Sequence, residues 1–229
     1  MIPAPPTAPP ATRRWNARVL SLKRLSSSGY LLSLSRDDLP FLPGQLVNLY
    51  GADPLHERSY TICSGPNDPT LDILFRHIPT GLLTPQLVAL HPGQTVPVLG
   101  PLGEFTLRDP HAPSLFIATG TGIAPARAYL RGHPSPALTI LHGVRHPEDL
   151  FFRNEFAATD YTPCVSSAPG HGHHGRVTTW LTRDRADRFQ AFYLCGANEM
   201  IYEVRDTLLA WNVPPHRIYT EAYYYRADD

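Results

Sequence analysis

The pattern of apolar residues changes near residue 110, and this change restricts the fold more than any other feature of the sequence. Before it, short apolar runs alternate with turn residues, and five runs are clear: 17–22, 30–34, 45–50, 71–76 and 94–99. Together with the segment 58–61, about six strands at this spacing predict an antiparallel barrel or sandwich. One helical stretch, residues 84–90, interrupts them.

After residue 113, strand-like and helix-like segments alternate. Strands are expected at residues 114–118, 137–142, 161–165, 191–195 and 217–220, and helices at residues 124–131, 148–158, 177–181 and 199–211. This alternation predicts a parallel sheet with helices on both faces. The chain is therefore expected to form two domains, an antiparallel β-barrel over residues 15–110 and an α/β parallel-sheet domain over residues 111–229.

The proline content sets the N-terminus apart from both domains. Proline makes up 25 of the 229 residues, which is about twice the usual ~5%. Much of this excess lies in the first ten residues, so residues 1–14 are predicted to be a disordered Pro-rich tail. The segment also lacks the apolar core of a secretory signal, and a cytoplasmic location is therefore expected.

Charge, hydropathy and cysteine spacing exclude several protein classes. The 20 basic and 20 acidic side chains give zero net charge without a basic run, which disfavours nucleic-acid binding. No run reaches the roughly 18 apolar residues that a membrane span needs. Cys63, Cys164 and Cys195 are too dispersed for a zinc ribbon or an iron–sulfur cluster. The histidines between Gly170 and Gly175 lie in a flexible loop, so no metal site is expected.

The first candidate binding segment follows the strand predicted at residues 114–118. It reads Gly120-Thr121-Gly122-Ile123-Ala124-Pro125. Glycines let a phosphate approach the backbone, and the next helix N-terminus offers free amides. Without the third glycine of the usual fingerprint, a plain strand-to-helix turn is an equal alternative for this loop alone. Small groups after two other strands, Ser166-Ser167 and Cys195-Gly196, favour a dinucleotide crevice.

The second candidate segment, Arg58-Ser59-Tyr60-Thr61, lies in the predicted barrel. Strand alternation places Arg58 and Tyr60 on one face, where the guanidinium could pair with a diphosphate and the ring could lie on a flavin. The Thr61 hydroxyl could donate to a ring nitrogen. Taken alone, however, the segment is better explained as a surface strand with an ion pair between Arg58 and Glu57.

Taken in order, the motifs resemble those of the ferredoxin-NADP reductase family of flavoenzymes. Arg58-Ser59-Tyr60-Thr61 is similar to the family's flavin motif Arg-x-Tyr-Ser/Thr. Gly81-Leu82-Leu83-Thr84 is similar to its second flavin segment, whose amides and hydroxyl bind the pyrophosphate. Gly100-Pro101-Leu102-Gly103-Glu104-Phe105 is similar to the turn that closes the barrel. The resemblance therefore covers the predicted barrel.

The resemblance continues through the α/β region, to about residue 225. The loop from Gly120 to Pro125 is similar to the family's nicotinamide-nucleotide loop. Gly143-Val144-Arg145 and residues 149–155 are similar to the stretch after the next strand, and Cys195-Gly196 to the cysteine beside the nicotinamide. The ordered set of motifs is far more specific than any one of them.

The resemblance implies an FAD enzyme that uses NADP, with NAD possible. NAD(P)H would pass a hydride from C4 to flavin N5, and the flavin would pass electrons singly to a ferredoxin or flavodoxin. The implied FAD-binding residues are Arg58, Ser59, Tyr60, Thr61, Phe75, Arg76, His77, Ile78, Gly81, Leu82, Leu83, Thr84 and Tyr223. The implied NAD(P)-binding residues are Thr119, Gly120, Thr121, Gly122, Ile123, Ala124, Pro125, Gly143, Val144, Arg145, Ser166, Ser167, Arg176, Cys195 and Gly196.

Four residues would act at the reacting atoms. By resemblance, Thr61 would hydrogen-bond near flavin N5, Cys195 would position the nicotinamide, and Glu221 would relay a proton. Tyr223 is the favoured one of three tyrosines, with Tyr224 and Tyr225, to cover the flavin face. The alternative is that these tyrosines only cover the sheet edge.

The sequence departs from the family at the end of the third strand of the α/β sheet. The arginine that usually meets the 2′-phosphate of NADPH is absent, because the segment reads Ser166-Ser167. No acid stands there to bind the unphosphorylated ribose of NADH either. Arg176, with two histidines nearby, could supply the charge, so NADPH is expected and dual use is open.

The sequence leaves alternatives for the electron carrier and for the type of reductase. A docking patch for an acidic carrier is expected from five basic residues, Arg13, Arg14, Arg18, Lys23 and Arg24. One alternative is an NADH-dependent reductase component of an oxygenase system, or a reductase of free flavin or metal chelates. Another is a flavin-free binding or sensor module that kept the fold.

Overall fold

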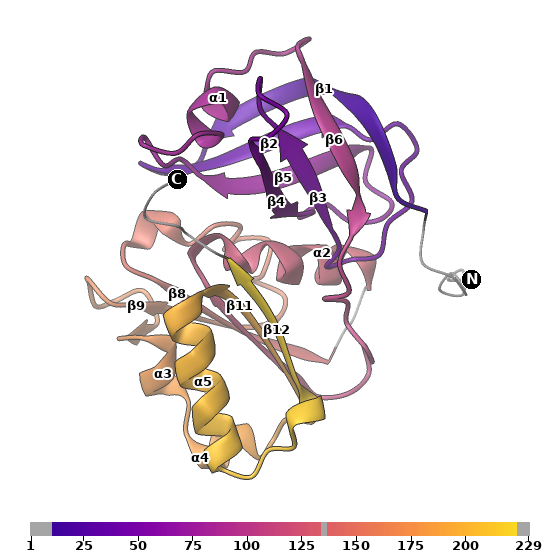
Figure 1. Cartoon of the computed structure of the whole chain (residues 1–229). Coiled ribbons are helices and arrows are strands. Elements are labelled where there is room, and N and C mark those ends of the chain that lie inside the picture. Colours follow the sequence, from indigo (N-terminus) through magenta and orange to yellow (C-terminus); the bar gives the residue numbers. More distant parts are fainter. Residues whose placement is uncertain (1–10, 134–136, 224–229) are drawn as a thin grey trace.

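The computed structural model describes residues 11–133 and 137–223 and shows two stacked domains. In Figure 1 the N-terminal half, indigo to magenta, forms a barrel above a sheet built from the C-terminal half, pink to yellow. The predicted fold class, an antiparallel β-barrel followed by an α/β parallel-sheet domain, is confirmed.

The barrel has six antiparallel strands in the order β4-β3-β6-β1-β2-β5. They are β1 (Arg13–Arg24), β2 (Gly29–Ser35), β3 (Leu46–Tyr50), β4 (Glu57–Thr61), β5 (Thr70–Arg76) and β6 (Thr95–Leu102). The short helix α1 (Thr84–Val88) lies between β5 and β6 in the chain. A single antiparallel bridge between Ile62 and Ile73 joins the two end strands, so the barrel is nearly closed.

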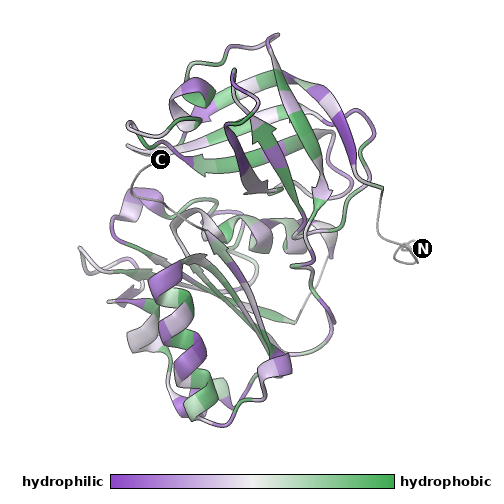
Figure 2. Ribbon diagram, in the orientation of Figure 1, coloured by the Kyte–Doolittle hydropathy of each residue, from purple (hydrophilic) through white to green (hydrophobic). Residues whose placement is uncertain are grey.

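Alternation along the strands fills the barrel. On β2, Leu32 and Leu34 are fully buried, whereas Leu31 and Ser33 between them are only partly buried. Successive side chains of a strand point to opposite faces, so every second apolar residue enters one core. Figure 2 shows the resulting change between apolar and polar positions along these strands.

The second domain is a six-stranded parallel sheet in the order β10-β9-β8-β7-β11-β12. Its strands are β7 (Ser114–Thr119), β8 (Leu138–Val144), β9 (Asp160–Val165), β10 (His173–His174), β11 (Ala191–Ala197) and β12 (Ile218–Tyr223). The helices are α2 (Ala124–Gly132), α3 (Val177–Trp180), α4 (Arg183–Ala186) and α5 (Asn198–Ala210), with 3₁₀ turns η1 (Gly120–Ile123), η2 (Pro147–Asp149) and η3 (Pro215–Arg217).

Helices cover both faces of this sheet, as predicted. On β7, Phe116 packs into the cluster on the α2 side, and Leu115 and Ile117 pack into the cluster on the α5 side. In Figure 1, α2 lies between the sheet and the barrel. The α2-side cluster also includes Cys63 and Leu74 of the barrel, so the two domains share one core.

The elements of the structure differ from the predicted ones at four places. The helix expected at residues 148–158 is the turn η2 followed by further turns, because Phe152 has a positive φ of 59° that a continuous helix does not allow. The loop of histidines contains the strand β10, and helix α4 was not predicted. Residues 1–10 of the predicted tail lie outside the described residues, but Arg13 and Arg14 at its end already pair with β6.

Candidate active site

Two adjoining clefts lie where the domains meet. The smaller, about 330 Å³, is lined by β4, the end of β5, the segment leading into α1 and the end of β12. The larger, about 730 Å³, lies over the ends of β7, β8 and β11. Arg76 and Thr121 line both clefts, so a group in one would lie next to a group in the other.

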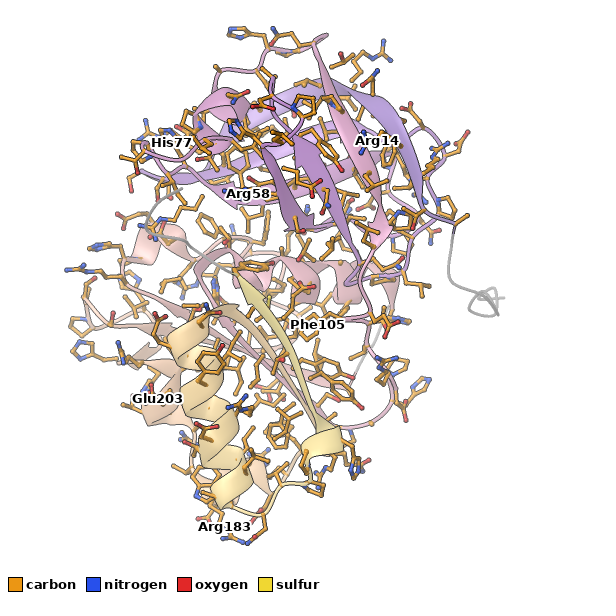
Figure 3. All side chains as sticks on the ribbon, viewed as in Figure 1. Arg14, Arg58, His77, Phe105, Arg183 and Glu203 are labelled. Carbon is orange, nitrogen blue, oxygen red and sulfur yellow. The ribbon has the colours of Figure 1, made fainter. Side chains whose placement is uncertain are left out.

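The smaller cleft gathers almost all residues predicted to hold the flavin. Its lining includes Arg58, Ser59, Tyr60, Thr61, Phe75, Arg76, Ile78, Gly81, Leu82, Leu83, Thr84 and Tyr223. His77 does not line it: the His77 amide donates to the carbonyl of Ser28, and its ring lies edge-on to Tyr30, with centroids 6.1 Å apart. Figure 3 shows Arg58 and His77 on the part of the barrel that carries this cleft.

Strand β4 presents its side chains in the alternating pattern that the sequence predicts. Arg58 and Tyr60 are half-buried, whereas Glu57 and Ser59 are exposed. Arg58 Nη1 donates to the carbonyl of Glu57 at 2.7 Å, and the Tyr60 ring packs edge-on against Phe75. The strand therefore forms a cleft wall that offers a guanidinium and an aromatic ring.

The loop before α1 also lines this cleft. The Thr84 hydroxyl accepts from the Ile78 amide at 2.9 Å and donates to the Ile78 carbonyl at 3.0 Å, which closes the loop on itself. A Cβ on Gly81 would lie 3.2 Å from the Ile78 carbonyl oxygen, so the turn favours glycine. An aromatic ring, a guanidinium and a tight loop are groups that fit a flavin with a diphosphate.

The four predicted catalytic residues come together at this cleft, where Thr61, Glu221 and Tyr223 line the wall and Cys195 lies beside Glu221. The Thr61 hydroxyl donates to Glu221 Oε2 at 2.6 Å and lies 2.9 Å from Tyr223 Oη. Since a threonine hydroxyl has one proton, Tyr223 is the donor to Thr61. Cys195 Sγ lies 4.0 Å from the same Glu221 oxygen. We call Thr61, Cys195, Glu221 and Tyr223 the proton cluster. Tyr224 and Tyr225 lie outside the described residues.

Burial sets the protonation of this cluster. It raises the pKa of Glu221 from 4.5 to about 7, although the Thr61 hydroxyl lowers it in part. Burial and the nearby Glu221 carboxylate hold the pKa of the Cys195 thiol well above its usual value. Glu221 can therefore gain or lose a proton near neutral pH, while Cys195 stays a thiol and is a poor nucleophile.

The larger cleft contains part of the predicted nucleotide site. Its lining includes Thr119, Gly120, Thr121, Gly143, Val144, Arg145, Ser166 and Arg176. Gly120 has a φ of 53°, and no heavy atom lies within 4 Å of the position that a Cβ would take. The loop therefore leaves room for a phosphate beside the backbone, which is the arrangement expected for a dinucleotide.

The other predicted nucleotide residues do not line this cleft. They are Gly122, Ile123, Ala124, Pro125, Ser167, Cys195 and Gly196. A Cβ on Gly122 would lie 2.3 Å from the carbonyl oxygen of Cys195, so this glycine lets η1 pack against β11. Ile123 and Ala124 are buried in the core shared with the barrel. Motif spacing therefore identifies the loop but not which of its residues face the cleft.

Several lining residues were not predicted. The barrel contributes Ser27, Ser28 and Gly29, and the α/β domain contributes Asp149 and Glu203, among others. A Cβ on Gly29 would lie 2.4 Å from Cζ of Phe151, so a glycine here lets the two domains meet. The run of three serines before this glycine was the only local signal. Asp149 Oδ1 is buried in the cleft wall without a hydrogen-bond partner in the structure.

Charged groups gather at the outer end of the larger cleft. Arg145 and His146 are exposed there, and Arg176 Nη1 lies 3.8 Å from Glu203 Oε2 on α5. Figure 3 shows Glu203 on this helix. The nearby His173 hydrogen-bonds Thr179 at 2.8 Å. Within residues 11–133 and 137–223, no three histidine, cysteine or acidic side chains gather as a metal site, and no helix is long and apolar enough to cross a membrane.

The basic residues predicted as one docking patch do not form one. Strand β1 extends over twelve residues, which puts its ends roughly 35 Å apart at ~3.3 Å per residue. Arg13 and Arg14 are at one end, bonded to the Asp37 carbonyl and to Tyr50 Oη. Arg24 is at the other end, where it donates to the carbonyls of Ser26 and Ser27. The extended strand separates charges that are close in sequence.

Comparisons with known proteins agree with this arrangement. A family model described as an oxidoreductase FAD-binding domain matches residues 18–107, and one described as an oxidoreductase NAD-binding domain matches residues 116–206. The chain is 33% identical over 227 residues to the toluate 1,2-dioxygenase electron transfer component of Pseudomonas putida, which covers 91% of this chain and 67% of that protein.

Two further relatives cover nearly the whole chain. Ferredoxin–NADP reductase B of Sorangium cellulosum is 33% identical over 238 residues, which covers 91% of this chain and 97% of that protein. The crystal structure of an Amycolatopsis cytochrome P450 reductase superposes with a TM-score of 0.84 at 27% identity, over 93% of this chain and 70% of that one. The chain therefore belongs to the ferredoxin-NADP reductase family and is an FAD- and NAD(P)-dependent oxidoreductase.

Proposed function

We propose that this protein oxidises NADPH and passes the electrons to a separate one-electron carrier of the ferredoxin or flavodoxin type. The observation that carries the proposal is the proton cluster, where Thr61 of the barrel meets Glu221 and Tyr223 of the α/β domain in the wall of the smaller cleft. The bound flavin supplies the chemistry, because it accepts a hydride and releases electrons singly.

The residues of the chain would bind and orient the two cofactors. Arg58 and the loop ending at Thr84 would hold the FAD diphosphate, and Tyr60 would offer its ring to the flavin. The backbone of Gly120 and Thr121 would hold the pyrophosphate of the nicotinamide nucleotide. The two lining residues that the clefts share, Arg76 and Thr121, mark where the two cofactors would meet.

The proton cluster would move the proton that accompanies electron transfer. Tyr223 donates to Thr61, and Thr61 donates to Glu221, so an ionised Glu221 terminates a chain of two hydrogen bonds. The pKa of Glu221, about 7, allows it to take up and release a proton at neutral pH. The cluster can thus exchange protons without a large change in free energy.

The cysteines of this chain support the proposal of a separate carrier. The chain has three, whereas a thiolate-held cluster ordinarily takes four, and all three are buried free thiols. Both 33% identical relatives carry names of electron-transfer proteins, one a component of a dioxygenase and one a ferredoxin–NADP reductase. We also propose that the domains span residues 15–110 and 111–229 and that the protein is cytoplasmic.

NADPH is the proposed donor because two cations, Arg145 and Arg176, line the outer end of the larger cleft. A second candidate, an NADH-dependent reductase component of an oxygenase system, is favoured by a different observation. Arg176 is already paired with Glu203, and Ser166 at the end of β9 brings no charge. The two candidates differ in the nucleotide that reduces the flavin faster.

Anaerobic stopped-flow absorbance tests the proposal. FAD-loaded protein is mixed with NADPH or NADH, and bleaching of the oxidised flavin is followed. Faster reduction by NADPH, followed by reoxidation by added ferredoxin or flavodoxin, is the expected result. Faster reduction by NADH would favour the oxygenase-reductase candidate, and protein that takes up no FAD would contradict both.

A further inference from the structure

A buried histidine lies directly beneath the nucleotide loop. His142, on β8, is fully buried, and its two ring nitrogens face two different partners. Nε2 lies 2.9 Å from the carbonyl oxygen of Gly120, and Nδ1 lies 3.1 Å from Tyr161 Oη on β9. These contacts connect β9, β8 and the loop after β7.

The partners determine the state of the ring. A carbonyl only accepts, so Nε2 carries the proton and donates to Gly120. Nδ1 is then an acceptor, and the Tyr161 hydroxyl donates to it. Burial lowers the pKa of His142 to about 4, so the imidazole is neutral at neutral pH, with the single donor and single acceptor that this arrangement needs.

The bond to Gly120 orients the peptide that follows it. In a trans peptide the carbonyl and the next amide point in opposite directions. With the Gly120 carbonyl held toward buried His142, the Thr121 amide points the other way, and both residues line the larger cleft. Gly120 has a positive φ and open space beside its Cα, so the glycine itself leaves the Gly120–Thr121 peptide free to rotate.

The second partner is itself held in place. The Tyr161 ring stacks on Phe156, with centroids 5.1 Å apart and an interplanar angle of 29°, and Phe156 is fully buried. On the other side of the loop, the Thr119 hydroxyl accepts from the Ala197 amide at 2.9 Å. The loop is thus held by hydrogen bonds from β8 and from β11, and the bond from His142 is the one that holds the Gly120 peptide.

We propose that His142, oriented by Tyr161, is a positioning residue that holds the Gly120–Thr121 peptide with its amide toward the diphosphate of the bound nicotinamide nucleotide. The inference rests on the proposed function only in that a nicotinamide nucleotide binds in the larger cleft. His142 would thus strengthen binding of the diphosphate without touching the ligand. Loss of His142 should therefore weaken ligands that have a diphosphate and spare those without one.

Isothermal titration calorimetry on the oxidised, FAD-loaded protein tests this without measuring activity. The two probes are NADP⁺ and adenosine 2′-monophosphate, which lacks the diphosphate. In His142→Leu, NADP⁺ should bind about tenfold more weakly, which corresponds to the loss of one well-oriented hydrogen bond. Adenosine 2′-monophosphate should change by less than about twofold.

Graded and matched variants complete the test. Tyr161→Phe should weaken NADP⁺ by about threefold, since the ring of His142 stays but loses its orienting donor. His142→Gln has a side-chain donor and acceptor and should stay closer to wild type than His142→Leu. Thr139→Val is the control, because it removes a different bond between β8 and β9, that of Thr139 with Asp160, away from the loop. It should leave both affinities unchanged.

The outcomes separate the two proposals. A wild-type protein that loads FAD but binds no nicotinamide nucleotide contradicts the proposed function. Normal NADP⁺ binding in wild type and in His142→Leu overturns the inference alone, as does an equal loss for both probes. If His142→Leu does not load FAD, the test rests on Tyr161→Phe, and an unchanged NADP⁺ affinity in that variant overturns the inference.

Discussion

Two groups of buried polar contacts join the domains, and they use acidic residues in opposite ways. One is the proton cluster, in which Glu221 contacts a hydroxyl and a thiol. The other, which we call the arginine latch, consists of Arg127 on α2 with Cys63, Asp72 and Glu155. In the latch, Arg127 donates to Asp72 at 3.2 Å, to Glu155 at 2.9 Å and to the Cys63 carbonyl at 3.2 Å.

The difference is the presence of a cation. Arg127 is only 8% exposed and gives both carboxylates of the latch a positive partner, with the Phe152 ring 4.3 Å from the guanidinium carbon. Among the contacts described for Glu221 there is no cation, and burial raises its pKa to about 7. The latch gives its two acids a shared cation that connects the domains, whereas Glu221, without a cation near it in the described part of the chain, can exchange protons near neutral pH.

Removal of the cation from the latch should have the largest effect. Arg127→Met leaves Asp72 and Glu155 without their shared partner, so the free energy of unfolding should fall by about 3–5 kcal/mol. Urea denaturation of the FAD-loaded protein measures this. Arg205→Met is the control, because Arg205 is 43% exposed where it pairs with Asp206, away from the latch, and it should cost no more than about 1 kcal/mol. Equal losses would contradict the distinction.

Neutralising Glu221 should change how stability depends on pH. The pKa of Glu221 is raised from 4.5 to about 7 in the folded protein, so the folded state holds the proton more tightly. Wild type should therefore lose stability relative to Glu221→Gln as pH rises from 4.5 through 7, by up to about 3 kcal/mol. Unfolding curves of both proteins at several pH values test this. A constant difference would show that Glu221 titrates normally.

Loss of the central hydroxyl should slow flavin reduction. Thr61 connects Tyr223 to Glu221, so Thr61→Val interrupts the chain of hydrogen bonds while it keeps the side-chain shape. Bleaching by NADPH should slow by about a hundredfold. Thr61→Ser, which keeps a hydroxyl, should stay within about tenfold of wild type. If both variants reduce the flavin equally slowly, the packing of the Thr61 side chain and not its hydroxyl sets the rate.

The smallest effect is expected at an exposed pair. Arg176 and Glu203 are 74% and 49% exposed, so their attraction is screened by water. Glu203→Gln should leave stability unchanged but free Arg176 for the nucleotide, and NADP⁺ affinity should rise by up to about fivefold. Calorimetric titration with NADP⁺ and NAD⁺ checks this. A gain with NAD⁺ as large as that with NADP⁺ would contradict a role for Arg176 toward the 2′-phosphate.

Local patterns in the sequence predicted where most helices and strands lie better than they predicted backbone conformation or which residues face the clefts. The strands of both sheets except β10, the long helix α5 and the order of the motifs follow from periodicity and turn residues. The helix predicted at residues 148–158 failed because its composition suits a helix, while the backbone at Phe152 takes a positive φ. Tertiary packing also decided that Ile123 and Ala124 face the shared core and not the nucleotide cleft.

The sequence by itself determined a barrel followed by a parallel sheet and most of the segments that line the two clefts, because strand and helix periodicities act over a few neighbouring residues. Only the tertiary structure decided what those residues can do. Thr61 and Glu221 are 160 positions apart, and His142 on β8 contacts Gly120, 22 positions away at the end of the neighbouring strand β7. Burial and hydrogen-bond partners set the pKa of Glu221 and the tautomer of His142, and both depend on contacts between distant segments that no local pattern encodes.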